Sequence, residues 1–361
     1  MKICIVGGGL VGLILAKILA LKGLSVDVYN ITKSTNYNRS RTIGIARSNI
    51  QYLEKIFANI KKTFWEINQI KIYTENFKNN EILNFSSPKN EIFSMVKNKE
   101  FLMVIRRDLF NNKLIKFKKN VSHKDVINKN YNLIINCDSQ NYISKKYFSK
   151  RIIKNYNSFA YTTIINHKKL FNNKIAVQVF TKKGPIAFLP ISAKQTSIVY
   201  SLRGNYFKNK NEIKKLIYKF NPRYEIIKIG NVSKFELNSS ILRNYYANNI
   251  LAFGDLLHKI HPHAGQGLNM SIRDIRYLSK LIDKKLNLGL NIDSSICLDF
   301  EKKMQSKNFV FATGVDWIYE FFKFESKIKN EVISKSINIL GKNKFFNSFF
   351  KKFADEGFIN Y

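Results

Sequence analysis

The sequence predicts an α/β fold: a parallel-sheet domain that is interleaved with a smaller antiparallel sheet and followed by helices at the C-terminus. Two observations predict it. Two segments far apart in the 361-residue chain each combine an apolar strand, a glycine-rich turn and an amphipathic helix, which is the pattern of a parallel α/β layer. Between them, residues 159–235 contain apolar runs at short spacings, which are typical of antiparallel strands. With 45% apolar residues, the chain can bury a sizeable core.

The first 30 residues predict a strand, a glycine turn, a helix and a second strand. The glycines of the turn have the spacing G-x-G-x-x-G and are Gly7, Gly9 and Gly12. Such a turn, after a strand and at the start of a helix, brings backbone N–H groups close to the pyrophosphate of a dinucleotide. At the end of the second strand, where an acidic residue would hold a ribose hydroxyl, the chain has Asn30, which hydrogen-bonds without a charge. We therefore predict dinucleotide binding.

A second stretch, residues 249–282, is the one around which the rest of the chain is organised. An apolar run, Ile250 to Phe253, predicts a buried strand that ends at Gly254 and leaves the carboxylate of Asp255 at its carboxyl end. After a loop, Gly265-Gln266-Gly267 begins a helix with apolar residues at spacings of three and four. Because no side chain covers the first N–H groups of such a helix, its positive end suits an anionic or planar ligand. A plain glycine-rich loop is the alternative.

The second stretch also carries a specific motif. Its residues are Gly254, Asp255, His258, His261, Pro262, Gly265, Gln266, Gly267, Asn269, Arg273 and Asp274. In these residues and in the N-terminal turn, the chain resembles the class A flavoprotein monooxygenases, which share the para-hydroxybenzoate hydroxylase fold, and within them the ubiquinone-biosynthesis hydroxylases. Further landmarks in that family's order are Arg41, Arg106, Asp138 and the segment 176–202. The resemblance extends from Met1 to about Leu281.

The resemblance implies FAD as the cofactor and NAD(P)H as the electron donor. The residues expected to bind the cofactor are Gly7, Gly9, Gly12, Asn30, Arg41, Arg106, Asp138, Gly254, Asp255, Gly265, Gln266, Gly267 and Asn269. His261 and Pro262 are expected beside the flavin, and no catalytic side chain is assigned because the cofactor carries the redox chemistry. Arg41 would pair with phosphate or carbonyl oxygens, against the alternative of a solvated arginine, and Arg107 is a rival to Arg106.

The expected domains are interleaved along the chain. A Rossmann-like FAD-binding domain is predicted to comprise residues 1–75, 101–158 and 236–290, a substrate domain with an antiparallel sheet residues 76–100 and 159–235, and a C-terminal helical segment residues 291–361. The sheet strands are predicted at 159–166, 175–181, 186–191 and 196–202, with Gly184-Pro185 as a turn. In the resembled fold, such a sheet covers the isoalloxazine and shapes the substrate pocket.

The activity that the resemblance implies is FAD-dependent hydroxylation of an aromatic ring with NAD(P)H and O2. The expected substrate is a polyprenylated phenol that is a precursor of ubiquinone. The first alternative is a flavoenzyme acting on a soluble aromatic acid or reducing an isoprenoid. The second is a flavin-fold scaffold subunit without turnover. It is motivated by three departures from the family pattern: Asn30, Ser139 where the family has glycine after Asp138, and Tyr142 in place of an expected serine. Other proteins of quinone biosynthesis are candidate partners.

Composition sets further expectations. The formal net charge of +36 by itself suggests a nucleic acid or an anionic membrane, but lysine abounds throughout the chain and no nucleic-acid motif accompanies it, so we expect no nucleic-acid partner. Three cysteines without paired spacing predict neither a disulfide framework nor a zinc site. His258, His261 and His263 lack a matching ligand set, so we expect no metal and a loop that lines the flavin. The N-terminus enters the first strand directly, which predicts a cytoplasmic protein without signal peptide or membrane span.

The C-terminal tail predicts how the protein reaches a membrane-borne substrate. One helical face carries five aromatic residues, with lysines among or beside them: Phe345, Phe346, Phe349, Phe350 and Phe353, and Lys344, Lys351 and Lys352. This is the pattern of an interfacial helix, so we predict a peripheral protein on the inner face of the cytoplasmic membrane. Two further apolar stripes are Ile333, Ile337 and Leu340, and Trp317, Phe321 and Phe322. The alternative is that all three stripes pack on the flavin domain.

Overall fold

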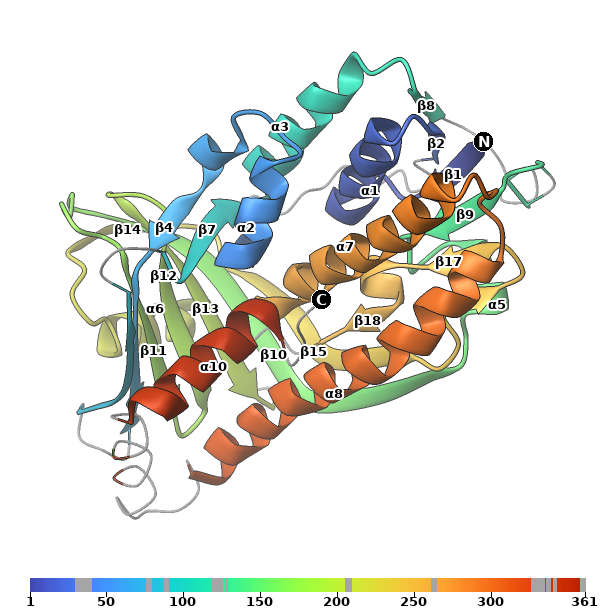
Figure 1. Cartoon of the computed structure of the whole chain (residues 1–361). Helices are drawn as coiled ribbons and strands as arrows, with labels where there is room; N and C mark the ends of the chain where they lie inside the picture. The colour runs from blue at the N-terminus through green and yellow to red at the C-terminus, as the bar shows by residue number, and fades with distance from the viewer. Residues whose placement is uncertain are drawn as a thin grey trace.

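The computed structural model describes residues 1–29, 41–75, 80–87, 91–118, 126–127, 129–204, 210–260, 265–325, 335, 339 and 343–357. Its strands form three sheets. The C-terminal helices α8 (Ser295–Glu325) and α10 (Lys344–Glu356) lie along one side of the molecule (Figure 1). Figure 1 shows α7 running through the middle of this view, between the N-terminal α1 and the long α8.

The N-terminal sheet has the strand order β16-β17-β9-β1-β2-β8. Its strands are β1 (Lys2–Val6), β2 (Ser25–Tyr29), β8 (Ile115–Lys118), β9 (Leu133–Asn136), β16 (Tyr246–Ala247) and β17 (Ile250–Ala252). All neighbours are parallel except β16 and β17. β1 and β9 are buried along nearly their whole length, as expected for strands covered by helices on both faces. The carboxyl ends of β1, β9 and β17 therefore lie side by side at one edge.

The largest sheet has nine strands, with β14 paired beside the path β18-β15-β10-β13-β12-β11-β5-β6. The strands are β5 (Gln69–Thr74), β6 (Glu81–Ser86), β10 (Arg151–His167), β11 (Ile175–Thr181), β12 (Gly184–Pro190), β13 (Gln195–Arg203), β14 (Ile226–Ile229), β15 (Ser233–Leu242) and β18 (His258–Lys259). Every pairing is antiparallel except that of β5 with β11. The sheet is therefore mixed.

A small sheet and a set of helices connect these parts. The sheet has the order β3-β7-β4, with β3 (Thr42–Ala46), β4 (Trp65–Ile67) and β7 (Phe93–Lys97). The helices are α1 (Leu10–Leu21), α2 (Arg47–Glu54), α3 (Asn98–Phe110), α5 (Tyr142–Tyr147), α6 (Lys210–Lys219), α7 (Gln266–Asn287), α8 (Ser295–Glu325) and α10 (Lys344–Glu356), with 3-10 turns η1 (Ile60–Thr63) and η3 (Gly254–Leu256). The main core lies between the parallel sheet, α1, α3 and α7.

The fold confirms the predicted α/β class and corrects several local expectations. β5, which lies within the segment 1–75 predicted for the FAD-binding domain, pairs with β11 of the large sheet. Gly184 and Pro185 begin β12 instead of forming the turn, which lies at residues 182–183. Gly184 has φ +131, and a Cβ there would lie 2.0 Å from the carbonyl oxygen of Ser201, so close strand packing explains this glycine. Residues 101–105 and Arg106 lie within α3.

Candidate functional site

Three loops meet where β1, β9 and β17 end. Gly7 follows β1, Asp138 follows β9 and Asp255 follows β17. Because β9 and β17 are parallel neighbours, both carboxylates lie at the same edge of the sheet. Burial raises the pKa of the Cys137 thiol, and the negative charges of Asp138 and Asp255 raise it further. Asp255 is exposed, whereas Asp138 has one buried carboxylate oxygen, Oδ2, that finds no hydrogen-bond partner among the described residues. A buried orphan acceptor of this kind indicates a missing donor.

The glycines of the N-terminal turn have different physical reasons. Gly7 has φ +117, a conformation that side chains rarely adopt. A Cβ on Gly12 would lie 2.0 Å from the carbonyl oxygen of Gly7, so this glycine permits α1 to pack on the end of β1. A Cβ on Gly9 would meet nothing within 4 Å. Packing within the protein therefore explains Gly12 but leaves open space at Gly9, where α1 begins.

The start of α7 shows the same contrast. Gly265 is the N-cap residue, with φ +62 in the left-handed region. A Cβ on Gly267, in the first turn, would meet nothing within 4 Å. The N-cap glycine offers no side chain to cap the helix, so it leaves the first N–H groups without the usual side-chain acceptor. Glycine lowers helix stability relative to alanine, and nothing in the described protein requires it at position 267.

Asn269 holds the beginning of α7 against β3. Its Oδ1 accepts hydrogen bonds from the backbone N–H of Ala46 (2.9 Å) and from Nδ2 of Asn49 (3.0 Å). Its Nδ2 donates to the carbonyl oxygens of Gly44 (3.1 Å) and Gly265 (3.2 Å). Because both ends of the amide are engaged by the protein, the geometry gives Asn269 a positioning role at this site.

A buried polar group holds the middle of α7. His258 Nε2 lies 2.5 Å from Asp274 Oδ2, and neither side chain is exposed. Asn308 on α8 donates from Nδ2 to the other carboxylate oxygen of Asp274 at 3.1 Å. His258 therefore joins β18 to α7 in the interior, which corrects the expectation that this histidine belongs to a loop lining the flavin. Within the described ranges, no group of three His, Cys, Asp or Glu side chains is placed to hold a metal ion.

The remaining predicted residues lie nearby or outside the described ranges. Arg106 is exposed on α3, and its Nη2 donates to the carbonyl oxygen of Gly8 at 3.4 Å, which brings it to the N-terminal turn. Arg41 is exposed just before β3. Gln266 is buried, and its Oε1 accepts from Arg273 at 3.4 Å. Asn30, His261 and Pro262 lie outside the residues that the structure describes.

The loop after β9 accommodates the two departures from the family pattern. Ser139 and Tyr142 are exposed. Asn141 caps α5 by accepting a hydrogen bond from the backbone N–H of Ser144 at 2.8 Å, and the Ser144 hydroxyl donates to the carbonyl oxygen of Asp138. The loop is thus ordered by Asn141 and Ser144, with the Tyr142 side chain directed away from the core.

A cavity of about 320 Å³ adjoins the start of α7. One end is lined by Gly44, Gly265, Gln266 and Asn269, and the other by Phe180 and Phe322, whose rings stack at a centroid distance of 3.7 Å. Most of the other lining residues are apolar: Ile70, Ile72, Leu83, Phe85, Phe93, Met95, Ala176, Ala187, Leu189, Val199, Phe311, Val315, Ile318 and Phe353. Strands of the large sheet form one wall and the two C-terminal helices form another.

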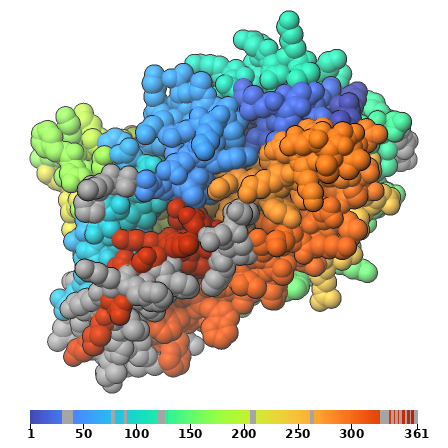
Figure 2. All heavy atoms as spheres, in the orientation of Figure 1, coloured from blue at the N-terminus to red at the C-terminus, as the bar shows by residue number. Residues whose placement is uncertain are grey.

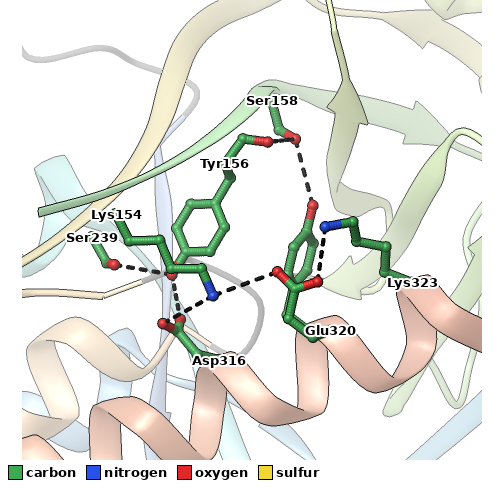
Figure 3. Close-up of polar contacts among 8 residues, drawn as sticks. Lys154, Tyr156, Ser158, Ser239, Asp316, Glu320 and Lys323 are labelled. Carbon is green, nitrogen blue, oxygen red and sulfur yellow. Dashed lines mark hydrogen bonds and ion pairs between the residues drawn. The ribbon is translucent and has the colours of Figure 1, made fainter.

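Polar contacts hold α8 against the large sheet as the second wall. Figure 3 shows Tyr156 of β10 between Ser239 of β15 and Asp316 of α8. The Tyr156 hydroxyl lies 3.0 Å from Ser239 Oγ and donates to the Asp316 carboxylate. Lys154 Nζ bridges Asp316 (3.5 Å) and Glu320 (3.4 Å) on successive turns of the helix. Burial raises the pKa of Tyr156, and its hydrogen bond to Asp316 raises it further, so the phenol stays protonated as the donor.

The helix α10 covers the side of the cavity. Figure 2 shows it on the surface between α2 and α8. Its Asp355 Oδ1 accepts a hydrogen bond from the backbone N–H of Ser48 at 2.9 Å, and Lys351 Nζ donates to the carbonyl oxygen of Ser86 at 2.7 Å. Phe353 is 8% exposed, and its ring centroid lies 5.1 Å from that of Phe311.

Phe353 of the predicted interfacial helix packs inside the protein, as the alternative of packing on the flavin domain expects for this residue. The other four phenylalanine side chains, and the stripe Ile333, Ile337 and Leu340, lie outside the described part of the chain. In the third stripe, Phe322 packs in the cavity wall, while Trp317 and Phe321 are exposed.

Known proteins share sequence similarity with the segments that form this site. The FAD binding domain model matches residues 208–288, which include β17 and α7. The chain is 24% identical over 226 residues to the mitochondrial ubiquinone biosynthesis monooxygenase COQ6 of Danio rerio, covering 51% of this chain and 47% of that protein. It is 29% identical over 152 residues to the 3-demethoxyubiquinol 3-hydroxylase of Escherichia coli, covering 40% and 39%. Over these stretches, the chain is similar to enzymes of ubiquinone biosynthesis. It spans about half the length of the curated relatives that it matches.

Solved structures support the same fold. The p-nitrophenol 4-monooxygenase PnpA of Pseudomonas putida superposes with a TM-score of 0.77 at 12% identity, covering 97% of both chains. HpxO of Klebsiella pneumoniae, in complex with FAD and uric acid, superposes with a TM-score of 0.75 at 13% identity, covering 99% of this chain and 97% of that one. At such identities, the likeness concerns the fold.

The residues at the sheet edge fit an FAD molecule. The open space at Gly9 and Gly267 and the orphan oxygen of Asp138 are features that a bound dinucleotide would use. The uncovered N–H groups of α7 suit the anionic end of a reduced flavin. The cofactor of this FAD-binding domain is FAD.

Several residues of the site were missed by sequence analysis. These are Gln178, Tyr319, Lys351 and Asp355 in the cavity wall, and Asn141 and Ser144 in the loop after β9. A signal existed for Gln178, since it is a polar residue at an inward position of an alternating strand. Lys351 and Asp355 had none, because their partners lie more than 260 positions away along the chain.

Proposed function

We propose that this chain is an FAD-dependent monooxygenase that hydroxylates an aromatic ring, using NAD(P)H and O2. The proposed substrate is a polyprenylated phenol on the path to ubiquinone. The names of the relatives support the reaction class, since they are called ubiquinone biosynthesis monooxygenase and 3-demethoxyubiquinol 3-hydroxylase. The proposed cofactor contacts are those predicted from sequence, with Asn269 as a positioning residue for α7.

The observation that carries the proposal is the apolar cavity that begins at the start of α7. Gly265 and Gln266 line both the helix start and the cavity, so a flavin ring against those N–H groups would face the cavity interior. The walls are built from aliphatic and aromatic side chains, which bind an apolar ring and prenyl groups by removing them from water. A long isoprenoid substituent therefore fits better than a small polar substrate.

The reaction consumes one NAD(P)H, one proton and one O2 and yields the ring hydroxyl, NAD(P)+ and water. Bound FAD supplies the transfer of electrons and the activation of O2. The chain's own residues orient the ring and keep water out. The amino end of α7 stabilises negative charge nearby. A contribution of up to ~2 kcal/mol would raise a two-electron potential by about 40 mV, which tunes the cofactor without determining the reaction.

The experiment is turnover with a defined phenol. The purified chain, loaded with FAD, is mixed with NADPH, isotopically labelled O2 and 2-geranylphenol, and the product is examined by mass spectrometry. The expected result is incorporation of one oxygen atom from labelled O2. If NADPH is consumed and only hydrogen peroxide forms with every prenylated phenol tried, the substrate assignment is refuted. A chain that binds no FAD and shows no yellow chromophore would point to the scaffold alternative.

The proposed localisation is the inner face of the cytoplasmic membrane, with the outer face of α8 as the contact surface. Four exposed apolar residues lie on that face at spacings of seven, four and three, which keeps them on one side of the helix: Val310, Trp317, Phe321 and Phe324. Lys303 lies seven residues before Val310 and is exposed. Aromatic side chains flanked by lysine suit an anionic lipid surface. None of the described helices is both long and apolar enough to cross a membrane.

The membrane proposal is tested by flotation with liposomes containing phosphatidylserine. We expect Trp317→Ser/Phe321→Ser to lose most binding, because each inserted ring contributes roughly 1.5–3 kcal/mol. The matched control is Phe171→Ser, which removes a 96% exposed phenylalanine from another part of the surface. Trp317 is one of two tryptophans, so a Trp65→Phe background reports its insertion by a blue shift in fluorescence. Equal flotation of the folded double variant and its parent would reject α8 as the contact surface.

A further inference from the structure

The sheet wall of the cavity contains a polar residue at an inward position. On β11, Ala176, Gln178 and Phe180 line the cavity from one face of the sheet. Val177, which also adjoins the cavity, packs with Val179 in the core cluster on the opposite face. Across the sheet, Gln178 is level with Ala187 of β12, which is level with Val199 of β13. Gln178 thus places an amide among aliphatic neighbours.

Among the described residues, the side-chain amide of Gln178 has no hydrogen-bond partner. Among the described residues, the other polar groups that line the cavity are mostly held by protein partners: Asn269, Gln266, Tyr319, Lys351 and Asp355. The side chains of Gln178 and Ser201 make no hydrogen bond within the described part of the chain. A polar group without a partner in an apolar wall is unfavourable unless a ligand or water satisfies it.

The position of Gln178 lies between the two ends of the cavity. A Cβ on Gly265 would lie 3.4 Å from the backbone nitrogen of Gly44, and a Cβ on Gly44 would lie 3.5 Å from Sδ of Met95. Met95 packs in one cluster with Ala176, so Ala176 marks the α7 end of the strand. Gln178 lies roughly 7 Å further along β11, about the width of one aromatic ring with its substituent. Phe180, at the next inward position, marks the far end.

Charge limits what this cavity can bind. Its charged lining residues within the described ranges are Lys351 and Asp355, which lie one helical turn apart on α10 and are each bonded to backbone. No arginine or histidine side chain of the described residues lines it. An aromatic acid would therefore lose the hydration of its carboxylate without gaining a dedicated cation. A neutral phenol needs one donor or acceptor, and an amide offers both.

We propose that the side-chain amide of Gln178 binds the oxygen substituent of a neutral phenolic ring and so determines which ring carbon faces the start of α7. The isoprenoid substituent then extends along the apolar wall toward Phe180 and Phe322. This inference rests on the proposed function and specifies its substrate class. Gln178 is a specificity-determining residue, and it takes no part in electron transfer.

The test compares two ligands that differ by one hydroxyl. Dissociation constants of 2-geranylphenol and geranylbenzene are measured from the change in flavin absorbance of the FAD-loaded chain. In Gln178→Leu, binding of 2-geranylphenol should weaken roughly five- to hundredfold, whereas binding of geranylbenzene should stay within about twofold. Gln178→Met, which keeps the length of the side chain, should behave in the same way and serves if the leucine variant does not fold. With 2-geranylphenol, the variants should also yield a mixture of ring isomers.

The controls separate the inference from the proposed function. Ser201→Ala removes the other unengaged polar side chain, at the level of Phe180, and should leave both constants unchanged; a loss confined to this variant would transfer the role to Ser201 and overturn the proposal. Equal weakening of both ligands in Gln178→Leu would show a change of cavity shape and also overturn it. If the parent binds 4-hydroxybenzoate more tightly than 2-geranylphenol, the neutral-phenol assignment fails. If the parent binds no phenol at all, the proposed function fails with it.

Discussion

Replacing Gly267 by alanine should stabilise the flavin-free chain and weaken flavin binding at the same time. A Cβ at this position meets no heavy atom within 4 Å, so the substitution creates no clash within the protein. Alanine is favoured over glycine in a helix by up to about 1 kcal/mol. If the flavin ring lies against the start of α7, however, the added methyl group occupies its space. A tenfold loss of FAD affinity corresponds to about 1.4 kcal/mol. We expect Gly267→Ala to lose at least tenfold, and Gly267→Val to lose more.

Gly265→Ala provides the matched comparison. Gly265 has φ +62, and its added Cβ would approach the backbone of Gly44 at 3.4 Å. The left-handed conformation costs an alanine roughly 1–2 kcal/mol, so this variant should be destabilised without flavin present. We therefore expect the free energy of unfolding to rise in Gly267→Ala and to fall in Gly265→Ala. Both variants should bind flavin more weakly than the parent.

The assay has two parts. Urea unfolding of the flavin-free proteins, followed by circular dichroism, gives the change in stability, and titration with FAD gives the affinity. The flavin-free state must be used for the first part, because bound ligand adds its own stabilisation. If Gly267→Ala and Gly267→Val keep the parent's flavin affinity, the flavin does not approach this helix start and the assigned site is wrong.

Three further predictions follow from individual contacts. Asp255→Ala should lower FAD affinity about ten- to a hundredfold, as expected for loss of a charged hydrogen bond, and unchanged flavin content would refute its contact with the cofactor. Asp274→Ala should cost about 3–5 kcal/mol in urea unfolding because it leaves buried His258 without its carboxylate; a cost below 1 kcal/mol would show that the pair is not important. Burial raises the pKa of Asp27, but hydrogen bonds from Tyr131 and Lys2 outweigh it and hold that pKa below its ordinary value. Its stabilisation is therefore present above about pH 3.9 and is lost as the pH falls through the folded-state pKa, so Asp27→Asn should lose less stability than the parent between pH 5 and pH 3.

The sequence by itself determined the elements whose signals are local. The turn with Gly7 and Gly12, the strand that ends at Gly254, and the helix that begins after Gly265 are all present where the residue pattern predicts them. Strand β11 has the predicted bounds. These signals depend on backbone conformation and on the period of apolar residues over a few turns or strands, and both are written in consecutive positions.

Only the tertiary structure decided which of these elements surround the cavity. The apolar run Phe101 to Ile105 forms part of α3, which packs against α1, η1 and β7. Phe353 is buried because α10 packs on the rest of the protein. That packing includes the hydrogen bond from the Ser48 backbone N–H to Asp355, which are 307 positions apart in the chain. Such contacts leave no local trace, because a helix with one apolar face can bury that face against lipid or against a sheet. The choice between them depends on the shape of the partner surface, which exists only after the distant segments have packed.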